Sequence, residues 1–264
     1  MDVATLLGIV IAGVAIIASS ILEGGNPAVL LFPPAIVLVL GGSLGVGLAS
    51  NRLGDMGGIV KATVSAVKPG KPIDGAATVT ELMAFADVAR QDGLLALEEK
   101  VKEVEDPFLR RGLELVVDGT DSDEVADALG QEIEAQRERH KVAAKYYADM
   151  GAYAPTIGII GTVMGLAHAL EQLDDPGKLG HAIGAALMAT LWGVMSANVF
   201  FLPVSAKLKR LSALEAAHRQ MLVEGVLAIQ AGASPRAVGE RLKSHLPPSK
   251  RDEVGGKAEE KASA

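Results

Sequence analysis

The sequence contains no cysteine, few aromatic side chains and no excess of basic charge. Without cysteine it can form no disulfide framework, no thiolate metal site and no cysteine nucleophile. An aromatic content of 3% and a formal net charge of −7 argue against nucleic-acid binding, which uses basic fields and stacked rings. Charged residues make up 22% of the chain, but they are unevenly distributed. Several long stretches contain no charged residue at all. This segregation argues against a single soluble globule.

Four of the uncharged stretches are long enough to cross a membrane. About 20 apolar residues are needed, since a helix rises about 1.5 Å per residue through a hydrocarbon core of about 30 Å. The stretches are Val3–Leu22, Ala28–Ser50, Gly151–Leu170 and Ala182–Ala206. The sequence therefore predicts a polytopic protein with four transmembrane helices in the lipid bilayer.

The distribution of Lys and Arg predicts the orientation of these spans. Basic residues near the ends of spans stay on the cytoplasmic side, and of the 25 bases only Lys178 falls in either short connection. Both termini and residues 52–150 are therefore expected on the cytoplasmic side of the membrane. A cleaved signal peptide is the alternative for the first span, but the chain starts with Met-Asp and the apolar core is too long.

The charged remainder has helical periodicity. Leu82, Phe85 and Ala89 recur at helical spacing, and Asp106-Pro107 is typical of a helix start. We expect Ser122 to cap a helix that runs on into the third span, and a helix after the fourth span to continue to about Gln230. Ser234-Pro235 predicts a last short helix that Pro247-Pro248 ends.

The predicted fold is all-α, with no strand signal of useful strength. We expect spans one and two in residues 1–51, a cytoplasmic helical domain in 52–150, and spans three and four in 151–206. Cytoplasmic helices should follow in 207–248, and the tail 249–264 is expected to be disordered because it is rich in Lys, Glu, Gly and Ala.

The predicted spans contain hydroxyls, glycines and prolines but no Asp, Glu, Lys or Arg. If the protein moves ions, a carboxylate must therefore come from another chain, because ionisable groups usually mark ion pathways in membranes. Thr162 and Thr190 offer oxygen ligands to a hard cation such as Na⁺. From the residues alone the favoured interpretation is simpler: each hydroxyl bonds a carbonyl of its own helix.

Two glycine pairs and several prolines in the spans bear on helix packing. Gly41 with Gly45, and Gly161 with Gly165, have the spacing of closely packed membrane helices. Pro33-Pro34, Pro155 and Pro203 remove backbone donors and can kink their helices. No nucleophile, base and orienting partner can be assembled from the motifs, so an enzyme is disfavoured.

Four segments together resemble the MotA/PomA family of flagellar stator proteins. They are ARQDGLLALE at 89–98, FLRRGLELVVDG at 108–119, APTIGIIGTVMGL at 154–166 and LGHAIGAALMAT at 179–190. The resemblance implies a homopentamer around two copies of a MotB/PomB-like protein, whose single span carries an aspartate. That aspartate would supply the carboxylate that this chain lacks.

The resemblance also implies roles for individual residues. Arg90 and Glu98 match charged residues that meet opposite charges on the rotor protein FliG, and Pro155 and Pro203 match prolines that couple ion flow to movement. Thr162 and Thr190 match threonines that line the site of sodium-driven members. The resemblance therefore favours Na⁺ over H⁺ as the transported ion, bound transiently, with no other metal and no cofactor.

Two other functions remain open at this point. One is an energiser of outer-membrane transport similar to ExbB/TolQ, although those proteins have three spans and this chain is expected to have four. The other is a membrane scaffold without ion flow, in which the threonine pair, the prolines and the pair Arg90 and Glu98 would be coincidental.

Overall fold

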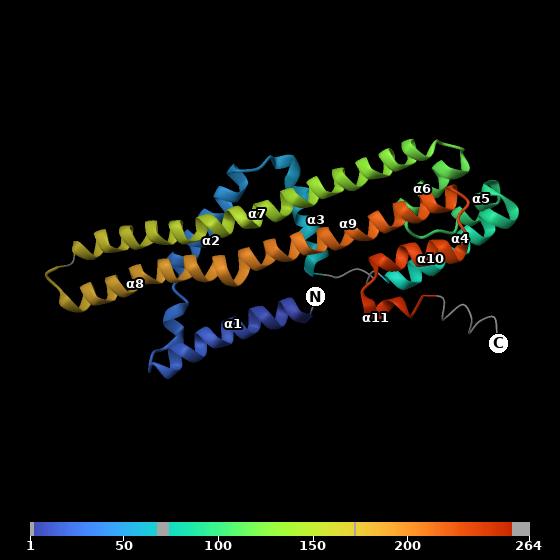
Figure 1. Cartoon of the computed structure of the whole chain (residues 1–264). Coiled ribbons are helices and arrows are strands. Elements are labelled where there is room, and N and C mark those ends of the chain that lie inside the picture. The colour runs from blue at the N-terminus through green and yellow to red at the C-terminus, as the bar shows by residue number, and fades with distance from the viewer. Residues whose placement is uncertain (1–2, 68–73, 172, 255–264) are drawn as a thin grey trace. The chain divides into compact units, whose positions relative to one another are not determined.

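The computed structural model describes residues 3–67, 74–171 and 173–254, and within those ranges it contains helices and turns but no strand (Figure 1). The all-α prediction is confirmed. The chain divides into two compact units. Unit 1 comprises Met1–Gly70 and Arg139–Leu211, and unit 2 comprises Lys71–Glu138 and Ser212–Ala264. Residues 52–67 and 139–150, which we expected in the cytoplasmic domain, thus group with the predicted spans.

Unit 1 is built on long apolar helices. The helices that lie wholly within it are α1 (Val3–Leu22), α2 (Pro33–Ala49), α3 (Met56–Val67) and α8 (Pro176–Met195), with short 3₁₀ turns η1 (Pro27–Leu30) and η2 (Leu53–Asp55). α8 passes into a π-helix, η4 (Ser196–Phe201). The second predicted span thus begins as a 3₁₀ turn and becomes α-helical only at Pro33. The first position of a helix suits proline, because the backbone N–H that proline lacks has no partner there.

Two helices contribute to both units. α7 runs from Ser122 to Leu170, and α9 runs from Leu202 to Gln230. The expected continuation of a charged helix into the third span is confirmed, as is the helix after the fourth span. The start of α7 differs from the prediction, because the Asp121 carboxylate, and not Ser122, accepts a hydrogen bond from the Asp123 amide at 3.0 Å.

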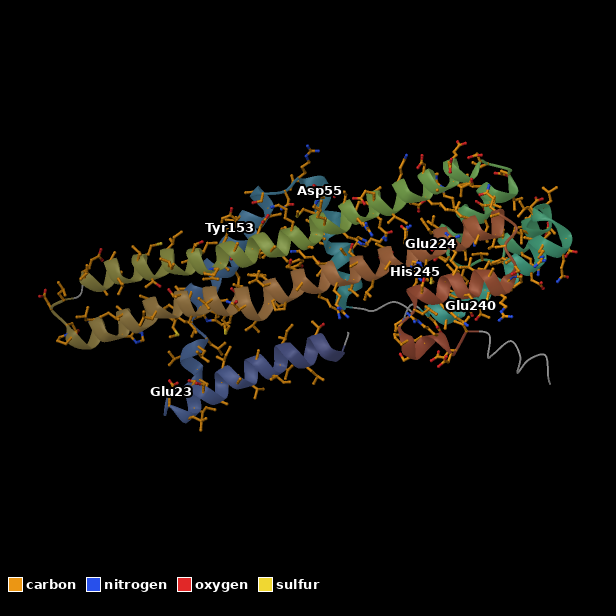
Figure 2. All side chains as sticks on the ribbon, in the orientation of Figure 1. Glu23, Asp55, Tyr153, Glu224, Glu240 and His245 are labelled. Carbon is orange, nitrogen blue, oxygen red and sulfur yellow. The ribbon has the colours of Figure 1, made fainter. Side chains whose placement is uncertain are left out.

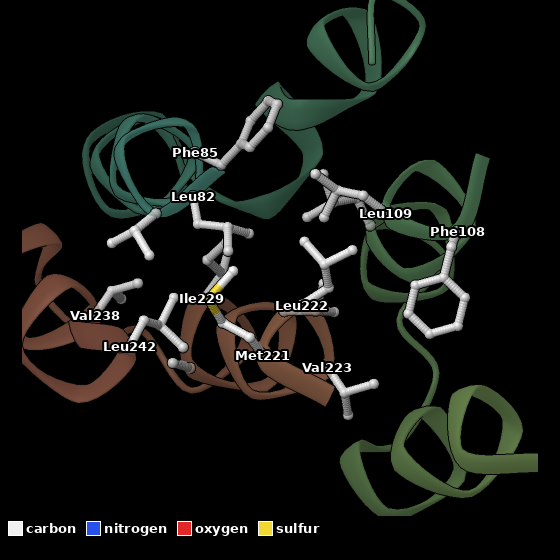
Figure 3. Close-up of a cluster of buried hydrophobic side chains, with 14 of the residues drawn as sticks. Leu82, Phe85, Phe108, Leu109, Met221, Leu222, Val223, Ile229, Val238 and Leu242 are labelled. Carbon is white, nitrogen blue, oxygen red and sulfur yellow. The ribbon is translucent and has the colours of Figure 1, made fainter. Parts of the chain in front are cut away.

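Unit 2 contains short helices around one apolar core. They are α4 (Gly75–Asp92), α5 (Leu97–Val101), α6 (Pro107–Val117), α10 (Pro235–Leu242) and α11 (Pro248–Arg251), with 3₁₀ turns η3 (Leu94–Ala96) and η5 (Lys243–His245). Figure 3 shows Leu82 of α4 facing Ile229 of α9, and Phe85 and Leu222 belong to the same buried cluster. The periodic residues of the sequence are the ones that this core buries.

The two ends of unit 2 show how local sequence sets helix boundaries. Asp106 caps α6, as predicted, and its carboxylate accepts from the Phe108 amide at 2.8 Å. The prediction for the last helix is only half right, because Ser234 starts α10 but the helix ends at Leu242. Pro248 begins the four-residue helix α11 instead of ending α10, so residues 249–251 of the expected disordered tail are helical. Residues 255–264 of that tail lie outside the described residues.

Candidate functional site

Helices α7 and α8 of unit 1 lie antiparallel and close together (Figure 1). Glycines make the approach possible. A methyl group at Gly158 would lie 2.7 Å from the Ala189 carbonyl oxygen, and one at Gly165 would lie 2.6 Å from the Ala186 β-carbon. Of the two predicted packing pairs, Gly161 and Gly165 both face α8, whereas Gly41 and Gly45 have no neighbour within 4 Å of the added methyl among the described residues.

This close approach brings Thr162 of α7 and Thr190 of α8 together. Their hydroxyl oxygens are 2.5 Å apart. The Thr162 hydroxyl oxygen also lies 3.1 Å from the Gly158 carbonyl oxygen of its own helix and 3.1 Å from the Ala186 carbonyl oxygen of α8. The own-helix bond favoured from the residues alone is therefore present for Thr162, together with contacts across to α8.

Four oxygens thus converge where α7 meets α8: two hydroxyls and two carbonyls. Oxygen ligands of this kind suit a hard cation, while none of them carries a charge. Across the residues that the structure describes, no group of three or more His, Cys, Asp and Glu side chains could hold a metal ion. A cation at Thr162 and Thr190 would consequently need its negative charge from outside this chain.

The two prolines lie near neighbouring contacts that α7 makes with the end of α8 and the start of α9. Pro155 lies inside α7, and a methyl group at Gly193 of α8 would lie 3.1 Å from its α-carbon. One turn earlier, a methyl group at Gly151 would lie 2.7 Å from a Leu202 methyl, and Pro203 is the next residue. The prolines therefore occupy nearby levels of the helix pair, on the side of Thr162 toward the start of α7.

The π-helix η4 ends at Phe201, two residues before Pro203, and was not predicted from the sequence. Pro203 has no backbone N–H and therefore donates no backbone hydrogen bond. The wider turns of π-helices are rare, and they are frequently found at functional sites. Side chains satisfy nearby carbonyls: the Asn198 amide donates to the Val194 carbonyl at 2.9 Å, and the Ser196 hydroxyl to the Gly193 carbonyl at 3.2 Å.

Arg90 and Glu98 lie in unit 2 on either side of a tight turn. Arg90 is in the last turn of α4, Glu98 is in the first turn of α5, and both are exposed. Gly93 makes the turn with a φ of 88°, a conformation that favours glycine. Leu97, which is fully buried, fixes α5 against the core, so both charges project from an anchored corner.

Sequence reasoning also missed a polar contact that ties the 3₁₀ turn η1 to α8. The Trp192 indole donates to the Leu30 carbonyl at 2.7 Å, two residues from Thr190. The sequence did contain a signal for such a bond: Trp192 is the single tryptophan, and a buried indole N–H usually donates a hydrogen bond. The partner itself depends on the tertiary fold.

Among the residues that the structure describes, three helical segments are long and apolar enough to span a membrane. They are Pro27–Ala49, Ser122–Leu170 and Pro176–Gln230, and Leu7–Leu22 is a shorter apolar helix. Three of the four predicted spans are contained in these segments. The exact count of four stays a prediction.

Comparison with known proteins identifies the family. Residues 100–221 match the model of the MotA/TolQ/ExbB proton channel family. Over 253 residues the chain is 38% identical to chemotaxis protein PomA of Vibrio alginolyticus, covering 95% of this chain and 98% of that protein. It is 34% identical over 247 residues to motility protein A of Bacillus subtilis, covering 94% and 92% respectively.

Solved structures agree over the same length. The C. jejuni MotAB structure matches with a TM-score of 0.90 at 31% identity, covering 94% of this chain and 97% of that one. The flagellar MotAB stator complex of Bacillus subtilis matches with a TM-score of 0.89 at 33% identity, covering 95% and 98%.

The apolar helices, the uncharged hydroxyl pair and the channel-family match define a membrane ion-channel protein and not an enzyme. More narrowly, the chain belongs to the family of motility protein A and PomA, the stator proteins of the flagellar motor.

Proposed function

We propose that this chain conducts Na⁺ through the flagellar stator and that the ion passes the hydroxyls of Thr162 and Thr190. The observation that carries the proposal is the convergence of those hydroxyls, 2.5 Å apart, with carbonyls of both helices. Such oxygens can replace water around a small hard cation. A proton needs no such group of ligands, so H⁺ is the second candidate ion.

The partner in this proposal is a MotB-like protein whose single span carries an aspartate. The predicted spans contain no Asp or Glu, and a cation beside uncharged oxygens needs a nearby negative charge in the low-dielectric membrane. The two similar solved structures are complexes named MotAB. Five copies of this chain would surround the partner's helices, with four spans per copy and both termini in the cytoplasm of a bacterial inner-membrane protein.

Exposed apolar side chains near Thr162 support this assembly. Ile159, Val163 and Met164 on α7 are exposed in the single chain. An apolar helix face of this kind has to meet lipid, another copy or a partner helix. We assign the part of it beside Thr162 to the partner.

Rotation speed against Na⁺ concentration tests the proposed ion. In tethered cells that carry only this stator set, at fixed pH and membrane potential, speed should rise with Na⁺ and saturate. Saturation indicates a binding site in the path. If speed ignores Na⁺ and follows the proton gradient, the transported ion is H⁺, and the threonines are ordinary helix hydroxyls.

Torque transfer is assigned to Arg90 and Glu98, as contacts to opposite charges on the rotor protein FliG. Both side chains are exposed on the corner around Gly93, and exposed charge pairs favour fast and reversible contact. Pro155 and Pro203 would couple ion passage to movement, because they interrupt the backbone bonding of α7 and α9 near the close contacts of Gly151 and Gly193.

The double reversal Arg90→Glu with Glu98→Lys should lower torque while leaving the complex assembled in the membrane. The reason is that like charges then oppose the rotor, while no buried contact changes. Stall torque of tethered beads measures the effect, and the double substitution Lys102→Glu with Glu99→Lys, on the same exposed surface, is the matched control. Unchanged torque in the first double variant would remove the proposed contact.

The alternative function is that of an ExbB/TolQ-like energiser of outer-membrane transport. The matching family model includes such energisers. The full-length relatives cited above are instead named motility protein A and chemotaxis protein PomA. Loss of the gene would discriminate the two functions. A stator gene should be needed for rotation of intact flagella, and an energiser gene for uptake across the outer membrane.

A further inference from the structure

A groove of about 480 Å³ opens in unit 1 at the end of α2, where a candidate membrane span stops. It is lined by Ala49, Ser50, Asn51, Arg52 and Asp55, with Val142 of α7. The Ser50 hydroxyl and the Asn51 amide donate to carbonyls of the last turn of α2, at 2.9 Å each, so both side chains are held in place. Arg52 is exposed, and Figure 2 shows Asp55 at the turn between α2 and α3.

The helix after the groove, α3, has two different faces. One face packs on α7: Ile59 is 3% exposed, and the Thr63 hydroxyl lies 3.0 Å from the Tyr147 hydroxyl. The other side of this segment presents Leu53, Val60 and Val64, which are 84%, 61% and 51% exposed. Lys61 is exposed next to this apolar strip. An anchored helix with an outward apolar strip and an adjacent base is typical of a helix at a membrane surface.

The segments of unit 1 that flank the predicted spans carry a net charge opposite in sign to that of the chain. The segments 52–61, 139–145 and 207–210 of unit 1 contain eight Lys and Arg residues and one acid, Asp55, whereas the whole chain has a net charge of −7. Asp149, the acid next along α7, is paired with Lys145 at 2.5 Å. Bases beside the end of a span attract acidic lipids of the cytoplasmic leaflet.

We propose that this groove binds the head group of an anionic phospholipid of the inner leaflet, a singly charged phosphodiester with hydroxyl groups beyond the phosphate, such as phosphatidylglycerol. Arg52 binds the phosphate, Asp55 accepts hydrogen bonds from the head-group hydroxyls, and the strip of Leu53, Val60 and Val64 enters the acyl region. Asp55 disfavours more highly charged phosphates by repulsion. The proposal rests on the membrane orientation given under the proposed function.

Lipid retention by the purified stator complex tests this site. The complex is placed in vesicles of equal parts phosphatidylglycerol, phosphatidylethanolamine and phosphatidylcholine, extracted in mild detergent, and its bound lipids are quantified by mass spectrometry. Wild type should retain phosphatidylglycerol at roughly fivefold its share of the vesicle. Arg52→Gln with Lys61→Gln should return the ratio to that of the vesicle, and Arg52→Gln alone should give an intermediate value.

The matched control removes one Arg and one Lys from exposed positions of unit 2, with Arg137→Gln and Lys102→Gln, and should leave the enrichment unchanged. Equal retention of all three lipids by wild type would overturn the proposal. So would enrichment that survives loss of Arg52 and Lys61, or displacement of the lipid by inorganic phosphate, which would make free phosphate the ligand. Retention is measured without an ion gradient or a rotor, so its outcome is separate from that of the rotation experiments.

Discussion

Replacing Thr162 by Ala is expected to abolish sodium-dependent rotation. The substitution removes the oxygen that lies within 3.1 Å of Gly158 and Ala186 carbonyl oxygens and 2.5 Å from the Thr190 hydroxyl oxygen. Losing one partner of such a part-buried polar contact costs up to about 1–3 kcal/mol, which corresponds to roughly fivefold to 150-fold weaker binding. Rotation speed of tethered cells at saturating and limiting Na⁺ measures the loss.

Two companion variants separate an ion ligand from a structural hydroxyl. Thr162→Ser keeps the oxygen and should restore most of the speed. Thr156→Ala removes a hydroxyl from the same helix that bonds only its own-helix carbonyl at Tyr153, at 2.7 Å, and should leave the sodium dependence intact. Full sodium dependence in Thr162→Ala would take away the reason to place Na⁺ at this pair.

The substitution Gly158→Ala should be nearly as damaging, although it adds a single methyl group. That methyl would lie 2.7 Å from the Ala189 carbonyl oxygen and 3.1 Å from the Thr190 α-carbon, both of which are backbone atoms. Backbone cannot rotate aside, so α7 and α8 must separate, at a cost of about 1–3 kcal/mol for an overpacked contact. Separation also pulls Thr162 away from Thr190.

The effect of Gly158→Ala is best measured as the yield of assembled complex together with rotation speed. Gly184→Ala is the matched control, because this glycine lies in α8, the other helix of the pair, and has no described atom within 4 Å of the added methyl. Gly184→Ala should assemble and rotate as wild type does. Equal behaviour of the two variants would mean that the close approach of α7 and α8 at Gly158 does not control function.

Much of the fold follows from local patterns in the sequence. The uncharged stretches mark the candidate spans, and the apolar spacing through Leu82 and Phe85 marks the core of unit 2. Helix starts at Asp106 and Ser234 follow from capping chemistry. The errors also lie at caps: Asp121 takes the role expected of Ser122, and Pro248 starts a helix, since proline is as well suited to a first turn as to a stop.

The candidate site was harder to predict, because its geometry depends on contacts between distant residues. Thr162 and Thr190 were singled out, but the residues alone favoured an own-helix bond, and only the glycines of α7 let the hydroxyls meet. The bond from Trp192 to Leu30 and the packing of α3 on Tyr147 join segments far apart in the chain. No local pattern specifies such pairs.

The π-helix before Pro203 determines which face of the helix its stripe of buried residues lies on. The buried residues Gly193, Ala197, Phe201 and Ser205 follow one another in steps of four. On a regular α-helix each such step overshoots a full turn by about 40°, so three steps would carry the stripe about a third of the way around the helix. The wider turn of Ser196–Phe201 absorbs this drift and keeps the stripe on α7. Chain length in this segment is therefore under tighter constraint than side-chain identity, since one residue fewer would rotate everything after it out of register.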